Sequence, residues 1–374
     1  MRFTLSSSAL SSRLSTLSKV INSKNSLAIL DCFLFDVTNN TLTITASDSE
    51  NVLTTKLALT ESDGEGHFAV NNKTILDAVR ELPEQPLTID VDTQNYTVKV
   101  VYQNGIYNFT AQNADEYPNV PVMSDGATTL QMPSSVLSDN ISRSLFATAT
   151  EELRPVMNGI YFDLTPDALA IVASDGHKLV RNRNYSIKSE VSTAFILPKK
   201  PATLLKSVLV KDESDVVVRF DERNAEVRFG DSVLMCRLIE GRYPNYNSVI
   251  PQNNPNQLSI DRKVLIGALR RVLPFASESS QLVRLHLEPG MLEVSSEDID
   301  FSTSAKEQIT CDYTGSTMNI GFKGPSLNEI LNNLTSDEVE LQLADPSRPC
   351  LVVPAQQPEN EDVLMLIMPM LLND

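Results

Sequence analysis

One seven-residue segment occurs three times in this chain, at spacings typical of whole domains. Leu42 to Asp48 reads LTITASD, Leu169 to Asp175 reads LAIVASD 127 positions later, and Leu292 to Asp298 reads LEVSSED after a further 123. Each copy alternates apolar with other residues and ends in an aspartate suited to a turn, which is typical of a half-buried strand and its exit. The spacing therefore predicts a chain built from three versions of one domain.

The segments around these strands repeat as well. Each copy begins with a short strand and an amphipathic helix, and its second half has the same order of strand, helix and further strands. We therefore predict an α+β fold of three repeated domains, each made of two strand–helix–strands units of about 60 residues. Clusters of Pro, Asn, Asp and Gly place the domains at 1–125, 126–254 and 255–374.

Charge is distributed unevenly over the predicted elements. The chain carries a formal net charge of −17, which on its own argues against nucleic acid as a partner. The six predicted helices nevertheless hold thirteen Lys or Arg against five Asp or Glu, whereas the rest of the chain holds 18 against 43. Such a bias can serve solubility alone, but on so acidic a background it favours a phosphate-facing surface. With no zinc-finger spacing and no Trp, we expect contact with nucleic acid to be independent of sequence. The helix windows are 7–21, 73–82, 134–148, 198–209, 261–276 and 323–334.

A linear array of sheet-bearing repeats leaves unpaired strand edges at its two ends. Joining the first end of one chain to the last end of another, head to tail, closes a ring. Strands near Tyr107 and Phe275 carry aromatic residues in the outer parts of the first and third domains. We predict that they form a dimer seam.

No sequence motif indicates catalysis. The chain has no phosphate-binding loop, dinucleotide fingerprint, zinc-protease motif or nucleophile elbow. Ser174, Asp175 and His177 form one cluster that a small-molecule hydrolase could use, but triads assemble from separated elements, and a tight Asp-Gly turn explains the same residues. His67 and His286 fit structural positions. We predict a protein without catalysis of its own, metal or cofactor, and keep the hydrolase as the alternative.

Cysteine usage and the apolar runs bear on the compartment. Cys32, Cys236, Cys311 and Cys350 lie far apart without a CxxC pair, so we expect free thiols in a reducing cytoplasm. No apolar run reaches the roughly 18 residues of a membrane span, and the start of the sequence has no apolar signal region. We expect a cytoplasmic protein without a membrane partner.

The end of the sequence carries an unusual apolar run. Residues 363–372 read VLMLIMPMLL, with three methionines. We expect a final buried strand that Pro369 interrupts, which leaves Met370, Leu371 and Leu372 with less reason to be buried. Adaptable methionines beside a strand end are suited to receiving varied peptides.

Several motifs in fixed order resemble one known family over essentially the whole chain. They are residues 157–162 (MNGIYF), 173–179 (ASDGHKL), 241–246 (GRYPNY) and 368–370 (MPM). In this order and spacing they resemble the beta subunit of bacterial DNA polymerase III, the replicative sliding clamp. The resemblance implies a head-to-tail homodimeric ring with inner helices and outer antiparallel sheets. Such a ring encircles duplex DNA and tethers the replicative polymerase.

The resemblance also implies a partner pocket between the second and third domains and the tail. It would take short peptide motifs from the replicative polymerase, the clamp loader, repair polymerases and mismatch-repair proteins. The matching positions are Met157, Ser174, Gly176, His177, Lys178, Leu179, Pro244, Val249, Leu366, Ile367, Met368, Pro369 and Met370. DNA-facing positions would include Lys24, Arg80, Lys199 and Lys200.

The chain departs from the family pattern at the tail and on one wall of this pocket. The tail continues through Leu371 to Asp374, where many relatives stop sooner. Ser280, Lys323 and Ser326 replace bulkier, aromatic or differently polar residues, which bears on peptide preference rather than on the existence of a pocket. Glu151 stands where a DNA-facing polar residue is expected, and it is left out of the DNA-facing set.

Overall fold

The order of elements repeats six times along the chain, as strand, helix and three further strands. The computed structural model describes residues 1–151, 153–209 and 214–372. This order confirms the predicted strand–helix–strands units and the α+β fold class. Each of the three predicted domains holds two units.

The first predicted domain holds β1 (Arg2–Ser6), α1 (Ser7–Leu17), β2 (Cys32–Thr38), β3 (Thr41–Ser47) and β4 (Asn51–Ala58), then β6 (Gly66–Asn71), α2 (Asn72–Arg80), β7 (Pro86–Val91), β8 (Thr97–Tyr102) and β9 (Gly105–Thr110). The second holds β10 (Thr128–Pro133), α3 (Ser134–Leu145), β11 (Gly159–Leu164), β12 (Leu169–Ser174) and β13 (Lys178–Asn184), then β14 (Thr193–Pro198), α4 (Lys199–Leu209), β15 (Asp215–Phe220), β16 (Asn224–Phe229) and β17 (Ser232–Arg237).

The third holds β18 (Asn256–Asp261), α5 (Arg262–Val272), β19 (Leu282–Glu288), β20 (Met291–Asp298) and β21 (Thr303–Thr310), then β23 (Met318–Lys323), α6 (Gly324–Asn332), β24 (Glu338–Leu343), β25 (Cys350–Pro354) and β26 (Glu361–Ile367). Two three-residue strands, β5 (Glu61–Asp63) and β22 (Asp312–Thr314), lie outside this pattern, as do four short 3-10 turns: η1 (Ala28–Asp31), η2 (Pro155–Met157), η3 (Tyr246–Val249) and η4 (Leu273–Phe275).

Three of the helices begin directly where the preceding strand ends, because the last residue of that strand caps the helix. Ser6 accepts a hydrogen bond from the amide of Ala9, Asn71 from that of Thr74, and Asp261 from that of Val264. α1 is shorter than the predicted window, since it ends at Leu17 and leaves Ile21 outside the helix. Ser18 takes the C-cap position there, and its hydroxyl bonds the carbonyl of Ser15.

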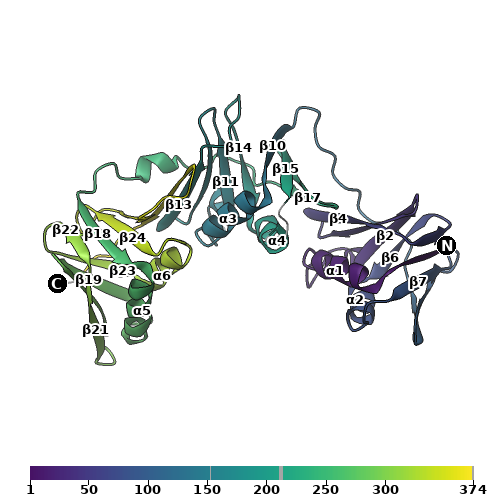
Figure 1. Cartoon of the computed structure of the whole chain (residues 1–374), viewed down its shortest axis with the longest axis horizontal. Coiled ribbons are helices and arrows are strands. Elements are labelled where there is room, and N and C mark those ends of the chain that lie inside the picture. Colours follow the sequence, from purple (N-terminus) through teal and green to yellow (C-terminus); the bar gives the residue numbers. More distant parts are fainter. Residues whose placement is uncertain (152, 210–213, 373–374) are drawn as a thin grey trace. The chain divides into compact units, whose positions relative to one another are not determined.

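The chain forms two compact units, each with a long antiparallel sheet. The first contains residues 1–138 and 203–238, and its sheets run β5-β1-β7-β8-β9 and β10-β15-β16-β17-β4-β3-β2-β6. Within this unit α1 and α2 lie side by side (Figure 1). The pairing of β4 with β17 joins strands of the first and second predicted domains into one sheet.

The second unit contains residues 139–202 and 239–374. Its sheets run β14-β11-β12-β13-β26-β25-β24-β18-β22 and β21-β20-β19-β23. Here β13 and β26 pair over their full lengths, from Lys178 opposite Ile367 to Asn184 opposite Glu361. α5 and α6 pack against each other and close a core that includes Leu269, Leu285 and Leu331, all fully buried. None of the helices in the described part of the chain combines the length and apolarity needed to cross a membrane.

Candidate functional site

The repeated aspartate closes an equivalent turn in each copy of the repeated strand. Asp48 Oδ1 accepts hydrogen bonds from the amides of Glu50 and Asn51, and Asp298 Oδ1 accepts one from Phe301. Asp175 Oδ1 accepts from the amides of His177 and Lys178, both at 2.9 Å. The turn explains the aspartate at every copy, as the sequence predicted.

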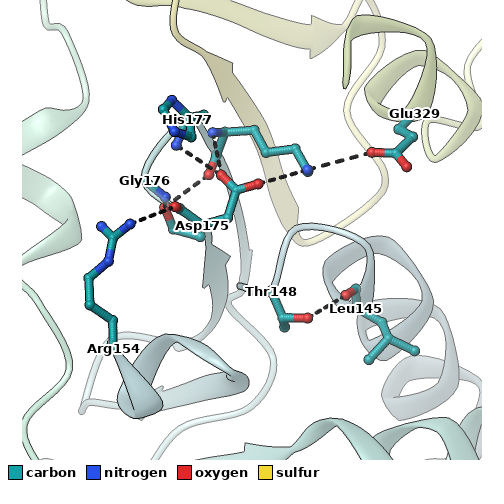
Figure 2. Close-up of polar contacts among 9 residues, drawn as sticks. Leu145, Thr148, Arg154, Asp175, Gly176, His177 and Glu329 are labelled. Carbon is teal, nitrogen blue, oxygen red and sulfur yellow. Dashed lines mark hydrogen bonds and ion pairs between the residues drawn. The ribbon is translucent and has the colours of Figure 1, made fainter. Parts of the chain in front are cut away.

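The middle copy carries an additional cation above its turn. Gly176 has φ +91°, which favours glycine, and a Cβ built there would lie 2.9 Å from Arg154 Nη1. Arg154 donates to the carbonyl of Asp175 at 3.4 Å and lies 3.5 Å from Glu151. Figure 2 shows Arg154 reaching this turn from one side. Arg154 was not among the predicted site residues, because it precedes the recognised motif and only the fold brings it here.

Lys178 serves the turn through its charge. Its Nζ lies 2.8 Å from Asp175 Oδ2, and its side chain is only 11% exposed. Burial raises the pKa of the Asp175 carboxyl, but hydrogen bonds from Lys178 and His177 outweigh that effect and hold the pKa below its usual range. The Lys178 ammonium is therefore the counter-ion of the Asp175 carboxylate.

The tail is attached at both sides of Pro369. β26 ends at Ile367, and the amide of Met368 donates to the carbonyl of His177 at 2.8 Å. The amide of Met370 donates to the carbonyl of Gly321 on β23, also at 2.8 Å. Pro369, which has no N–H, lies between these two bonds. Leu371 beyond them is 83% exposed, consistent with the predicted interruption of the strand.

An apolar cluster lies behind the turn and the tail. Leu179 and Leu366 face each other in the sheet and pack with Tyr243, Tyr246 and Ile250. The rings of Tyr161 and Tyr243 stack at 4.6 Å, and Tyr246 donates to Asp163 at 2.8 Å. These tyrosines were not predicted as site residues, although the GRYPNY motif contains two of them.

The 241–250 loop brings the remaining predicted residues to this place. A Cβ at Gly241 would lie 2.8 Å from Val156, next to buried Met157. Pro244 is exposed on the loop, and Val249 is 52% exposed. With exposed His177 and Met368 they offer an accessible, largely apolar surface beside the cluster. Ile367 and Lys178, which are paired across β26 and β13, point to the other face of the sheet, where Ile367 packs into the core with α5 and α6 and Lys178 approaches Glu329 on α6.

The three departures from the family pattern lie on the C-terminal part of the second unit. Lys323 is the exposed last residue of β23, and Ser326 is half-buried in the first turn of α6. Ser280 is half-buried in the segment between η4 and β19. None of these side chains adds an aromatic surface.

The hydrolase alternative is wrong for a geometric reason. Ser174 Oγ donates to the carbonyl of Lys178 at 2.9 Å and accepts from the amide of Gly176 at 3.1 Å. Asp175 is bound by backbone amides and Lys178, and His177 takes part in the described contacts through its backbone only. A nucleophile needs a base within hydrogen-bond reach, and these residues build a turn instead.

Three of the four predicted DNA-facing residues lie at helix ends, and Lys24 lies in the segment that follows α1. Lys24 is exposed after α1, and Arg80 is exposed in the last turn of α2. Lys199 and Lys200 open α4 and are half-buried. Burial and the charge of Lys178 lower the pKa of Lys199, while Asp175 opposes this. This lysine therefore lies within electrostatic range of the Asp175 turn.

Basic residues of α5 are largely held by the protein itself. Arg271 makes a two-pronged pair with Glu307, at 2.6 and 2.7 Å, and Arg262 donates to the carbonyls of Leu331 and Ser336. The sequence-based charge count therefore overstates what this helix offers to a phosphate.

The predicted seam residues lie at or beside open sheet edges. Tyr107 is on β9, the last strand of its sheet. Phe275 is 40% exposed in the 3-10 turn η4 rather than on a strand, because α5 ends at Val272 before Pro274. η4 packs beside β20 and the edge strand β21.

The four cysteines are free thiols, as predicted, and three of them are buried. Burial, reinforced by the charge of Asp31, raises the pKa of the Cys32 thiol to about 11. Among the described residues no group of three His, Cys, Asp or Glu side chains is arranged to hold a metal.

Models of three protein domains match this chain in order. They are the N-terminal, central and C-terminal domains of the DNA polymerase III beta subunit, at residues 1–121, 131–245 and 247–371. Together they span nearly the whole sequence.

Full-length relatives and structures agree with that match. The beta sliding clamp of Pseudomonas putida KT2440 is 28% identical over 376 aligned positions, covering all of both chains. A DnaN sliding clamp from Pseudomonas aeruginosa bound to griselimycin has a TM-score of 0.94 at 24% identity, over all of both chains. One from Bartonella birtlesii, also bound to griselimycin, has a TM-score of 0.92 at 26% identity, again over all of both chains.

Proposed function

This chain belongs to the DNA polymerase III beta subunit family, and we propose from that premise that it is a replicative sliding clamp which encircles duplex DNA and tethers the polymerase. It is a processivity factor rather than an enzyme. Two copies join head to tail into a ring, and the contact with DNA is independent of sequence.

The observation that carries this proposal is the sixfold repeat of one strand–helix–strands unit over the whole chain. Such a repeat supplies a helix per unit for one surface and leaves edge strands, β9 and β21, for joining to a second copy. In this proposal the domains are 1–125, 126–254 and 255–374, Tyr107 and Phe275 lie at the seam, and Lys24, Arg80, Lys199 and Lys200 face DNA. The protein works in the cytoplasm, where DNA is replicated in bacteria.

The partner site in this proposal is the surface around the Asp175 turn and the tail. Short peptides from the replicative polymerase, clamp loader and repair proteins insert an apolar side chain beside Leu179, Leu366 and the exposed Met368. The accessible apolar surface at Pro244, Val249 and Met368 supports this assignment. The residues proposed to form it are Met157, Ser174, Gly176, His177, Lys178, Leu179, Pro244, Val249, Leu366, Ile367, Met368, Pro369 and Met370.

A topological experiment tests the clamp itself. The protein is loaded by a bacterial clamp loader onto a nicked circular plasmid, freed of loader by gel filtration, and the plasmid is cut once. A ring slides off the free ends, so the protein leaves the linear DNA while it stays on the uncut circle. Retention on linear DNA with open ends contradicts the proposal.

A further inference from the structure

A groove lies on the β21-β20-β19-β23 sheet, on the face opposite α5. It begins where the tail passes β23. It has a volume of about 740 Å³ and is lined by residues of β19, β20 and β21, the 277–280 segment and the tail. Leu282, Arg284, Glu293 and Ser295 lie on this face because their neighbours Val283, Leu285, Leu292 and Val294 fill the core beneath α5. Leu371 and Leu372 line its tail side.

Large apolar side chains are exposed at this groove. Ile299 at the β20–β21 turn is 83% exposed, its neighbour Phe301 is 78% exposed, and Leu371 at the tail is 83% exposed. Such clustering is unusual on a free surface and marks places where another molecule binds. One wall of the groove is β21, whose edge we propose joins the second copy, and the groove is the face of this sheet rather than that edge.

The charge in the groove is negative and in part unpaired. Four acidic residues line it against two basic ones, and Lys306 lies 4.0 Å from Glu293. Glu297 and Asp300 are exposed, and neither is paired with a cation in the described part of the chain. Beside them Ser296 is only 6% exposed, and its hydroxyl has no hydrogen-bond partner among the described residues. Apolar and acidic surface together fit a ligand that is apolar and basic.

The groove continues the proposed partner site. The amide of Met370 bonds Gly321, and Leu372 packs against that glycine, where a Cβ would lie 2.8 Å from Leu372 Cδ2. The protein's own tail therefore runs from the Asp175 turn past Gly321 to the groove, so residues 368–372 border both surfaces.

We infer that this groove is a second recognition site for partner peptides, taking a basic and apolar segment that flanks the motif in the first site. It rests on the proposed function, because it needs a peptide anchored at the Asp175 turn. The groove adds selectivity among partners through Glu297 and Asp300, while Ile299 and Leu371 receive apolar side chains.

Two labelled twelve-residue peptides test this inference. Both carry an apolar-ended motif in the first half; the second half alternates Leu with Lys in one and Leu with Gln in the other. Fluorescence anisotropy at 50 mM salt is expected to show roughly fivefold tighter binding of the Lys peptide, and the gain is expected to shrink at 500 mM salt. A Glu297→Gln/Asp300→Asn variant is expected to bind both peptides equally.

The matched control is Asp167→Asn/Glu190→Gln, which removes two exposed charges from loops of the other sheet and is expected to keep the full gain. Equal binding of the two peptides by the unaltered protein overturns the inference, as does a gain that persists in the groove variant. A groove variant that shifts only the monomer–dimer equilibrium assigns this face to a second copy and overturns it too. The Gln peptide reports on the first site alone, so loss of its binding marks failure of the proposed function separately.

Discussion

Lys178 on β13 lies 3.5 Å, Nζ to Oε2, from Glu329 on α6, and so joins the turn of the central repeat to a helix of the last one. Figure 2 shows Glu329 facing the Asp175 turn from the side opposite Arg154. The same ammonium pairs with Asp175 at 2.8 Å. Charged groups from both repeats therefore meet beside the proposed partner site.

Lys178→Met is expected to weaken peptide binding and to lower stability by about 1 to 3 kcal/mol, because it leaves the partly buried Asp175 carboxylate without its cation. Glu329→Gln, which alters a half-exposed partner, is expected to change stability far less. Urea unfolding and peptide titration of both variants check this. Equal losses in the two variants contradict the assignment of Asp175 as the main partner.

Arg143 and Glu361 form a well-buried ion pair of the second unit, with 2.6 Å between Nη1 and Oε2 and side chains 13% and 11% exposed. Because Asn140 and Asn184 also donate to Glu361, Arg143→Met strands a buried carboxylate and is expected to cost about 3 to 5 kcal/mol. The control is Arg13→Met, whose partner Asp231 is 69% exposed. Thermal unfolding is expected to show a clear fall for the first variant and a small one for the second.

The raised pKa of His286 predicts that the stability of the fold depends on pH. Hydrogen bonds with Asn319 and then Glu288 raise the pKa of its imidazole above the ordinary value near 6.5. A raised folded-state pKa adds stability that is complete below the unfolded-state pKa and is lost as the pH rises through the folded-state pKa. The melting temperature of the unaltered protein is therefore expected to exceed that of His286→Gln at pH 5.5, with the gap closing toward pH 8.5. A gap that widens with pH has the wrong sign.

Two truncations separate the functions of the tail. A chain that ends at Met370 keeps the bond from its amide to Gly321, whereas one that ends at Pro369 loses it. Deleting Met370 to Asp374 is expected to weaken partner-peptide binding and to leave the dimer intact, because the proposed seam lies elsewhere. Titration calorimetry measures the peptide affinity, and unchanged affinity of the shorter chain counts against the tail as part of the site.

Charged substitutions at Tyr107 and Phe275 test the proposed dimer seam. Tyr107→Glu or Phe275→Glu places a carboxylate at an interface that we propose to be apolar. Each variant is expected to raise the dissociation constant of the dimer at least tenfold. The reason is that burying an unpaired charge costs well over about 1.4 kcal/mol. Val191→Glu, at an exposed position in a loop, is the control. Sedimentation equilibrium is the measurement, and an unshifted dimer in both seam variants removes these residues from the interface.

Local pattern was sufficient to predict the order of elements and the aspartate turns. The alternation around Ile44, Ile171 and Val294 and the helical spacing that follows each first strand are set by short-range sequence. The sequence did not predict which strands of different domains pair. The pairings of β4 with β17 and of β13 with β26 depend on tertiary packing.

The candidate site was predicted through family motifs, and the fold adds residues that no motif signals. Arg154 reaches the turn only because it directly precedes η2 in the fold. The charge of Arg271 is neutralised by Glu307 on β21, which is 36 residues away in the sequence. A charge count cannot distinguish a free guanidinium from a paired one. The structure makes that distinction.

The pairing of β13 with β26 delays completion of this sheet until the end of synthesis. Arg181 and Asp362 form an ion pair across these strands, although 181 residues separate them in the sequence. At about 5 to 20 residues per second, a ribosome needs roughly 10 to 35 s to cover that distance. Over this interval β13 is without its β26 partner in the nascent chain, and an unpaired strand edge is open to pairing with other chains.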